Sequence, residues 1–178
     1  MISRRSIYLL ASTALLCAPA LQGQNAATDY RDEFLGQFEA SSRKITMLAE
    51  AMPQDLYEWS PAEGVMSVAR VYMHIARYNY GYPQDALDVP APTGVDLSTM
   101  EDITNKEEVT RILRQSVAHV REAAQSMSEA ELKDMTRLYG RDVAKWTVLL
   151  QLISHMNEHV GQSVAYARMN GIVPPWSR

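Results

Sequence analysis

Residues 142–170 read DVAKWTVLLQLISHMNEHVGQSVAYARMN. At about 100° per residue, one face of this segment carries apolar, amide and imidazole side chains, with no Lys, Arg, Asp or Glu among them. That face is formed by Val148, Gln151, Leu152, His155, His159, Gln162 and Tyr166. The segment stops at Gly171, ahead of Pro174 and Pro175, which is typical of a helix C-terminus. The stretch therefore predicts a long helix with one face in the interior of a helical bundle.

Three further segments show helical periodicity, each with its apolar residues on one stripe. They span approximately residues 29–50, 68–80 and 104–127. Ser67 is a good N-cap for the second segment, and residues 104–107 (TNKE) form a capping box for the third. A further capping box at residues 128–131 (SEAE) predicts a short helix. Because no run of strand alternation is convincing, the predicted fold class is all-α.

Residues 81–103 connect the second and third helical segments and contain several helix-breaking residues. These are Gly81, Pro83, Pro90, Pro92 and Gly94. The segment is therefore expected to be a long loop, and loops of this length in compact domains are often functional. Four amphipathic helices with one long connection predict a four-helix bundle with a crossover, a fold in which facing helices build ligand and metal sites. We expect this bundle to span residues 29–178.

The first 20 residues, MISRRSIYLLASTALLCAPA, have the features of a cleaved export signal. A basic start with Arg4 and Arg5 precedes an apolar stretch at residues 7–16, and residues 18–20 (APA) form a small-x-small cleavage pattern. The apolar stretch is shorter than the roughly 20 residues that a membrane-spanning helix needs. We therefore expect a periplasmic or secreted protein with no membrane association after cleavage, and a short flexible linker at residues 21–28. The paired arginines also match part of a twin-arginine export signal.

Cysteine content and net charge exclude several classes of function. Cys17 lies in the leader, and Leu16 before it is larger than the small residue typical of lipid-modification sites. The mature protein then has no disulfide and no thiol nucleophile, which excludes cysteine catalysis. The net charge is −4 and becomes more negative once the two leader arginines are removed. A chain of this charge has no electrostatic footprint for DNA or RNA, so we expect no nucleic-acid partner.

Two of the histidines are placed to share one metal ion. His155 and His159 are four residues apart on the longest predicted helix, so their side chains lie one turn apart on its uncharged face, with Cβ atoms about 5–6 Å apart. An unpaired imidazole in a bundle interior leaves buried polar atoms unsatisfied, at about 1–3 kcal/mol each, whereas a shared metal uses both rings. Spacing alone also allows a packing role, since such pairs arise by chance.

A metal site of this kind needs at least one further ligand. His74 is the best candidate, because it sits beside the inward stripe of the second helical segment. His119 lies about 120° from the centre of the third segment's apolar stripe, so it is expected at the surface or at the boundary. Residues 155–159 (HMNEH) also match the H-x-x-E-H zinc-protease pattern. We reject that interpretation, because Glu158 lies about 100° from His159 around the helix and no strand pattern is present to bind a peptide.

Five pieces of the sequence follow one another in a characteristic order. They are residues 52–56 (MPQDL), 59–61 (WSP), 67–74 (SVARVYMH), 155–162 (HMNEHVGQ) and 170–175 (NGIVPP). The most specific features are one histidine on the second helix, H-x-x-x-H followed by Gly-Gln on the fourth, and a Gly-Ile-x-Pro-Pro tail. This set resembles the DinB-like family, the YfiT-type metal-binding bundles. The resemblance covers essentially all of the mature chain.

The resemblance implies a bundle with a three-histidine site at His74, His155 and His159 that binds a divalent ion such as zinc or nickel. The family is often dimeric, so a homodimer is implied as well. Its better-known members resemble thiol-dependent transferases and isomerases, and some metal-dependent hydrolases, with a small-molecule substrate or ligand. The export leader departs from these members, because bacillithiol, mycothiol and glutathione are chiefly cytoplasmic. This departure weakens the case for a thiol cosubstrate.

Gln162 and Glu158 are the candidate catalytic residues beside such a site. Gln162 lies one turn beyond His159 on the same face, where its amide can bond a fourth metal ligand, a substrate oxygen or the backbone. Glu158 can support a ligand or act as a general base, and it can equally be a solvated acid of the helix surface. Tyrosines 72, 78, 80 and 82, together with the 81–103 loop, can wall a pocket near His74 or pack in the core.

Three hypotheses about function follow. The first is an exported metal-dependent hydrolase or transferase that acts on a small molecule at the three-histidine site. The second is a non-catalytic bundle that binds a metal or a ligand. The third is a structural bundle in which the histidines only pack.

Overall fold

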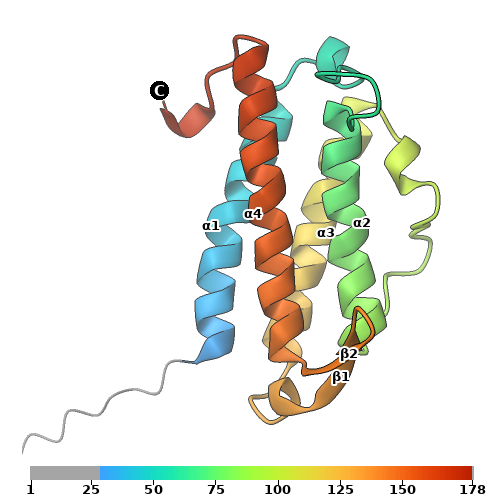
Figure 1. The fold of residues 1–178 in the computed structure, drawn as a ribbon, viewed down its shortest axis with the longest axis vertical. Coiled ribbons are helices and arrows are strands. Elements are labelled where there is room, and N and C mark those ends of the chain that lie inside the picture. Colours follow the sequence, from blue (N-terminus) through green and yellow to red (C-terminus); the bar gives the residue numbers. More distant parts are fainter. Residues whose placement is uncertain (1–28, 178) are drawn as a thin grey trace, which may run out of the picture.

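The computed structural model describes residues 29–177, which form a four-helix bundle (Figure 1). The helices are α1 (Tyr30–Ala51), α2 (Val68–Ala86), α3 (Lys106–Ser126) and α4 (Trp146–Met169). Short 3₁₀ helices occur at Gln54–Leu56, Met100–Asp102, Glu131–Lys133 and Pro175–Ser177. The predicted export signal at 1–20, with Cys17, and the predicted linker at 21–28 lie outside the described residues. Between residues 29 and 177, no helix combines the length and the apolar character that a membrane crossing requires.

A long crossover sets the arrangement of the helices. α2 and α3 pack side by side and run in the same direction, as do α1 and α4 (Figure 1). The start of α3 meets the end of α1, where Lys106 Nζ donates hydrogen bonds to the backbone carbonyls of Glu50 and Met52. Residues 87–105 therefore return along the outside of the bundle from the end of α2 to the start of α3. The predicted crossover between the second and third helices is confirmed.

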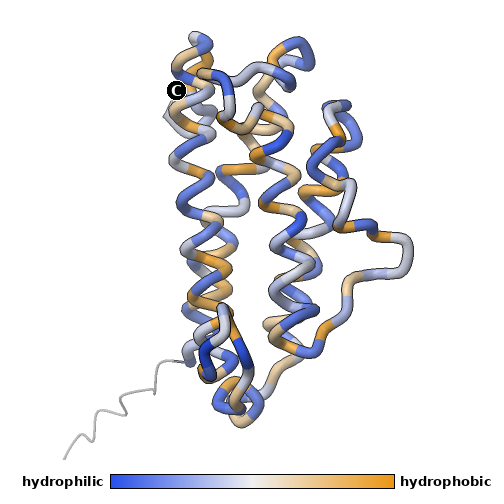
Figure 2. The backbone as a smooth tube through the Cα atoms, turned by 45° about the vertical axis from the view of Figure 1, so that its right-hand side comes forward, coloured by the Kyte–Doolittle hydropathy of each residue, from blue (hydrophilic) through white to orange (hydrophobic). Residues whose placement is uncertain are grey.

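Apolar residues at helical spacing build the core of the bundle. Large side chains with at most 1% of their surface exposed include Ile45, Leu48, Ile75, Leu113, Leu152 and Met156. Hydrophobic and hydrophilic residues alternate along each helix, as expected for amphipathic helices (Figure 2). Full burial of such a side chain contributes about 1.5–3 kcal/mol, so this shared interior drives the assembly of the four helices.

The helix starts follow the predicted caps with one shift. Ser67 accepts a hydrogen bond from the backbone N–H of Arg70, as predicted for the start of α2. At α3 the cap is Asn105, which accepts from the N–H of Glu108, so this helix is capped one residue later than the predicted box. The box at residues 128–131 forms both of its reciprocal hydrogen bonds, but it opens only a single 3₁₀ turn.

The predicted end of the second helix is wrong. α2 continues past residue 80 to Ala86 and includes Pro83 in its last turns. Proline lacks the N–H that a helix interior needs, which is why the sequence pattern favours an earlier stop. The helix continues because Tyr82 and Ala86 are buried, and tertiary packing outweighs the unfavourable local preference.

The bundle carries one small element that the sequence did not indicate. β1 (Met135–Leu138) and β2 (Arg141–Ala144) form an antiparallel hairpin beside the end of α2 and the start of α4 (Figure 1). The expectation of no strand is therefore wrong here, and so is the predicted start of the fourth helix near residue 142. Tyr139 and Gly140 form the two-residue turn with φ of 51° and 76°, the combination that a type I′ turn requires. Strands of four residues are too short to show alternation, so periodicity missed them.

Candidate metal centre

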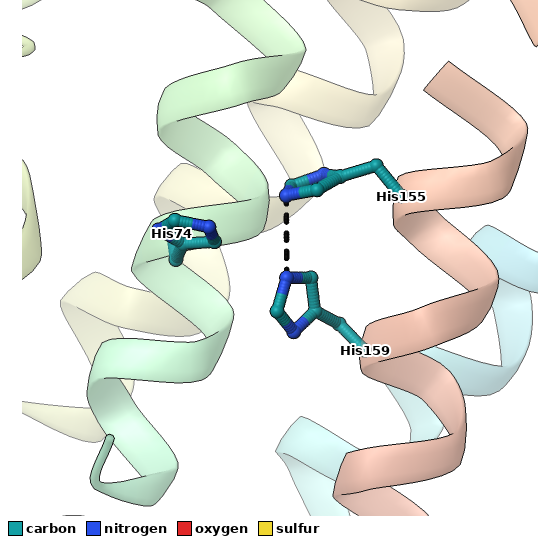
Figure 3. Close-up of side chains that lie close together, drawn as sticks. All are labelled: His74, His155 and His159. Atoms are coloured by element: carbon teal, nitrogen blue, oxygen red, sulfur yellow. Dashed lines mark hydrogen bonds between the residues drawn. The ribbon is translucent and has the colours of Figure 1, made fainter. Parts of the chain in front are cut away.

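Three of the four histidines meet between two helices. His74 comes from α2, and His155 and His159 come from α4 on the opposite side of the cluster (Figure 3). One ring nitrogen from each lies within 4.8 Å of the others. Nε2 of His155 and Nε2 of His159 are 3.2 Å apart. The structure thus brings together the three residues that the sequence analysis grouped.

Helix packing explains where the rings lie. α2 and α4 are antiparallel neighbours, and the end of α4 meets the start of α2 where the Tyr166 hydroxyl donates to the Met66 carbonyl at 3.0 Å. The four-residue spacing then places both α4 rings on the face that turns toward α2. His155 and His159 are buried, with 7% and 8% exposure, whereas His74 is only partly buried. The cluster therefore lies inside the bundle, and its solvent-accessible side is at His74.

Hydrogen bonds to the outer ring nitrogens orient two of the three imidazoles. His74 Nδ1 lies 2.8 Å from Glu101 Oε1, and because an ionised carboxylate can only accept, this nitrogen carries the proton. His159 Nδ1 lies 2.8 Å from Gln162 Oε1. The amide group of Gln162 in turn donates to the Tyr166 hydroxyl, which leaves its oxygen to accept from the ring. Both bonds leave the Nε2 atom of these rings unprotonated and on the side of the cluster, where a metal ion can replace the His155–His159 hydrogen bond.

Electrostatics keep the α4 rings neutral and the nearby carboxylate ionised. Burial, with His159 and His74 as neighbours, lowers the pKa of His155 to about 3. Burial also lowers the pKa of His159. Burial acts to raise the pKa of Glu101, but hydrogen bonds from His74 and Arg70 outweigh it and hold that pKa below its usual value. At neutral pH the site therefore offers imidazole lone pairs with a negative charge behind His74.

The donor set fits a divalent metal ion. Three histidines with one open position form a ligand set found in catalytic zinc sites. With metal–nitrogen bonds of about 2.0–2.1 Å, two ligands of a tetrahedral site have nitrogens about 3.3–3.4 Å apart. The separation of the two α4 nitrogens is close to that value. Acceptors on the outer nitrogens, as provided by Glu101 and Gln162, are also typical of metal-binding histidines.

Sequence reasoning missed Glu101, the residue that holds the outer nitrogen of His74. It lies in the crossover, in a short 3₁₀ helix, and its side chain is only 17% exposed. It also accepts from Arg70 Nε at 3.1 Å and lies 3.5 Å from Arg77 Nη1. A single acidic residue in a loop gives no periodic pattern in the sequence. The one feature that could have pointed to Glu101 was the length of the predicted 81–103 loop.

Glu158 and His119 lie outside the cluster. Glu158 has an exposed side chain, and among residues 29–177 no hydrogen bond joins it to the histidines. His119 is buried, not at the surface or boundary as expected, and its ring packs against Tyr80 with centroids 5.1 Å apart. The expectation was wrong because α3 packs against both α1 and α2, so its buried face is wider than a single stripe.

The tyrosines of α2 divide between the core and the site. Tyr72 and Tyr80 are buried in the core, with 1% and 2% exposure. Tyr78 lies against His74 and His155, with ring centroids 4.7 and 4.9 Å away. Tyr82 follows one turn later and packs on Tyr78, with centroids 5.0 Å apart. Aromatic rings therefore continue along α2 from the histidines toward the hairpin.

Comparison with known proteins identifies the family of this bundle. The DinB family model matches residues 23–178. The chain belongs to the DinB family. The resemblance read from the sequence is thereby confirmed. A comparison with curated proteins found no significant match.

Several solved structures share the DinB fold of this chain. A DinB-like protein from Bacillus cereus has a TM-score of 0.72 at 19% identity, over 83% of this chain and 98% of that one. The DinB-like protein YjoA from Bacillus subtilis has a TM-score of 0.62 at 18% identity, over 79% and 93%. YfiT from Bacillus subtilis, described as a probable metal-dependent hydrolase with an unusual four-helix bundle topology, has a TM-score of 0.63 at 14% identity, over 80% and 89%. At these identities the likeness shows a common fold.

Proposed function

We propose that this DinB-family protein is an exported, metal-dependent enzyme, a hydrolase or a transferase, that acts on a small molecule. The single observation that carries the proposal is the convergence of His74, His155 and His159 in one cluster, with the two α4 rings buried. The description of YfiT as a probable metal-dependent hydrolase supports the same reading for a related bundle. Zinc or nickel is the proposed ion, because both accept imidazole nitrogen.

The chain's own residues are proposed to hold the ion and fix its surroundings. His74, His155 and His159 bind it through neutral rings, and Glu101 and Gln162 orient two of these rings through their outer nitrogens. A divalent ion in such a site supplies a Lewis acid that activates water or a thiol as a nucleophile. Burial of the α4 rings excludes water from all but the open side of the cluster. The Gln162 amide is already engaged with His159 and Tyr166, which favours a positioning role for it over direct contact with substrate.

A non-catalytic metal-binding role is the second candidate, and one observation favours it. Glu158, the candidate general base, is exposed and makes no hydrogen bond with the cluster in the described part of the chain. In that case removing the metal would change the affinity for a bound small molecule, but a broad screen of esters, amides and thiol acceptors would find no turnover. Metal-dependent turnover of any of these compounds would support the enzyme.

Metal content tests the proposal directly. The full chain, purified without a histidine tag, is compared with His74→Ala and His155→Ala by elemental analysis. His119→Gln is the matched control, because it removes a buried histidine of the same bundle outside the cluster. We expect about one zinc or nickel per chain in the wild type and the control, and loss in both cluster variants. No metal in the wild type, even after incubation with zinc or nickel followed by dialysis, would refute the proposal.

Export and self-association are proposals carried by the sequence. The leader at residues 1–20 supports a periplasmic or secreted location, and the family resemblance supports a homodimer. N-terminal sequencing of protein recovered from the periplasmic fraction is expected to begin at Leu21. Light scattering on the same material is expected to give twice the mass of the chain.

A further inference from the structure

A pocket of about 230 Å³ opens between the end of α2, the crossover and the hairpin. Its walls include Tyr78, Tyr82, Leu97, Leu138 and Tyr139. The hydroxyls of Tyr82 and Tyr139 are hydrogen-bonded to each other, which ties the hairpin turn to α2. The pocket therefore depends on the hairpin and has a largely aromatic and aliphatic wall.

The pocket adjoins the histidine cluster along α2. Tyr78 contributes one wall of the pocket and also packs on His74 and His155. Tyr78 and Tyr82 follow His74 by four and eight residues, which corresponds to about 6–12 Å along the helix axis. The solvent-accessible side of the cluster is also at His74, which is only partly buried. A molecule lying along this side of α2 can thus reach both the cluster and the pocket.

Two arginines lie at the rim of the pocket. Arg77 donates through Nε to the Leu97 carbonyl, and its guanidinium lies over the Tyr78 ring, 5.3 Å from the centroid. Arg137 comes from β1; its side chain is 71% exposed, and its contact with Asp142 is long at 3.6 Å. Its Nη2 also donates to the Gly140 carbonyl at 3.0 Å. The exposed ion pair with Asp142 contributes little, so the remaining N–H groups of this guanidinium can bind another anion.

The acidic groups near the pocket pair only loosely with these two arginines. Asp85 is the one carboxylate among the lining residues, against two guanidinium groups. Glu101 lies 3.5 Å from Arg77, but the same carboxylate also pairs with Arg70 and His74. With Asp142 opposite Arg137, the nearby carboxylates are not outnumbered by the guanidinium groups, but the ion pairs of Arg77 and Arg137 are long, at 3.5 and 3.6 Å, so both guanidinium groups can form shorter bonds with a ligand. Guanidinium groups pair with carboxylate and phosphate through charge-assisted hydrogen bonds.

We propose that this pocket is the substrate-recognition site, and that it takes an elongated small molecule with an apolar or aromatic body and a terminal carboxylate or phosphate. Arg137 and Arg77 bind the anionic end, and the tyrosines contact the body. The reacting group then lies toward His74, about one to two helical turns away. This inference rests on the proposed metal-dependent function, because it assigns the far end of the same substrate. It makes the hairpin the element that determines specificity.

Binding of simple probes to the metal-free chain tests the pocket separately from the metal. The full chain is treated with a chelator and titrated calorimetrically with phenylacetate, phenyl phosphate and the uncharged phenylacetamide. We expect the anions to bind about tenfold more tightly than the amide, and Arg137→Gln to lose most of this preference. Arg141→Gln, on the neighbouring strand and outside the pocket lining, is the matched control and should bind like the wild type. The stronger of the two anions identifies carboxylate or phosphate as the preferred group.

The outcomes separate this inference from the proposed function. Equal affinity for the amide and both anions, or unchanged anion affinity in Arg137→Gln, overturns the inference whatever the metal content. Anion preference that depends on Arg137 supports it. If the same preparation binds no zinc or nickel when these are supplied, the metal-dependent function fails while the pocket remains a binding site. If it binds metal but does not select anions, the pocket inference alone fails.

Discussion

Glu101→Ala is the substitution that most directly tests how the cluster is held. It removes the carboxylate whose Oε1 lies 2.8 Å from His74 Nδ1. The side chains of Glu101 and His74 are only 17% and 22% exposed. The lost bond is charge-assisted and largely shielded from solvent, so little of its strength is screened. Loss of an outer hydrogen-bond partner lowers metal affinity about 10–100-fold, which corresponds to about 1.4–2.7 kcal/mol. We expect this variant to fall at the upper end, because the His74 ring then loses both its orientation and its negative partner.

Glu101→Gln provides a graded comparison. Its amide oxygen can still accept from His74, but the negative charge is gone, so we expect a loss of zinc affinity of about tenfold. Glu129→Gln removes an exposed glutamate outside the site and is the control for net charge. Zinc affinity is measured by competition with a chromophoric chelator, and thermal unfolding of the metal-free proteins shows whether each variant folds.

The expected order of zinc affinity follows from these bonds. Wild type and Glu129→Gln should be equal, Glu101→Gln weaker, and Glu101→Ala weakest. If Glu101→Ala folds and binds zinc as tightly as the wild type, Glu101 does not position His74, and the reasoning that links the crossover to the site is wrong.

Four further outcomes are expected. Gln162→Leu breaks the bond to His159 Nδ1 and should lower zinc affinity about tenfold in the same chelator competition. Burial lowers the pKa of His119 in the folded protein below its unfolded value of about 6.5. Because the unfolded chain then binds the proton more readily, the free energy of unfolding falls as the pH drops through that value. His119→Gln should show a smaller fall when urea unfolding is measured against pH. Gly140→Ala places a side chain at φ +76° and should cost about 1 kcal/mol in urea unfolding, with weaker anion binding at the hairpin pocket. Leu152→Ala empties a fully buried site and should cost about 2–5 kcal/mol by the same measurement.

The sequence was informative where the candidate site depends on helical periodicity. The uncharged face of residues 142–170 predicted both the inward side of α4 and the placement of His155 and His159 upon it. His74 beside the inward stripe of α2 was likewise found with the other two. Such features follow from a fixed angle per residue, so they can be read before any tertiary structure is known. The family resemblance then connected the two helices.

The remaining features depend on contacts between segments that are distant in sequence. Glu101 meets His74 across 27 residues, and no local pattern specifies that meeting. Pro83 favours an earlier helix end, which core packing overrides. His119 is buried because α3 packs against two helices, and a single apolar stripe in the sequence does not indicate the second contact. The turn at Gly140 supports strands that are too short for a periodic signal.

The helices and the crossover contribute differently to the candidate site. Because α2 and α3 run in parallel, the chain between them must return over the length of α2. The 19 residues of α2 correspond to about 29 Å along the helix axis. A bundle whose neighbouring helices alternate in direction is joined by short turns and has no segment of this kind. Here the return path passes the open side of the histidines and is fastened there by Glu101. Loops accept insertions and substitutions more readily than packed helices do. The helices can therefore keep the three histidines in place while the crossover diversifies, so that the surroundings of the cluster can change in evolution without repacking of the core.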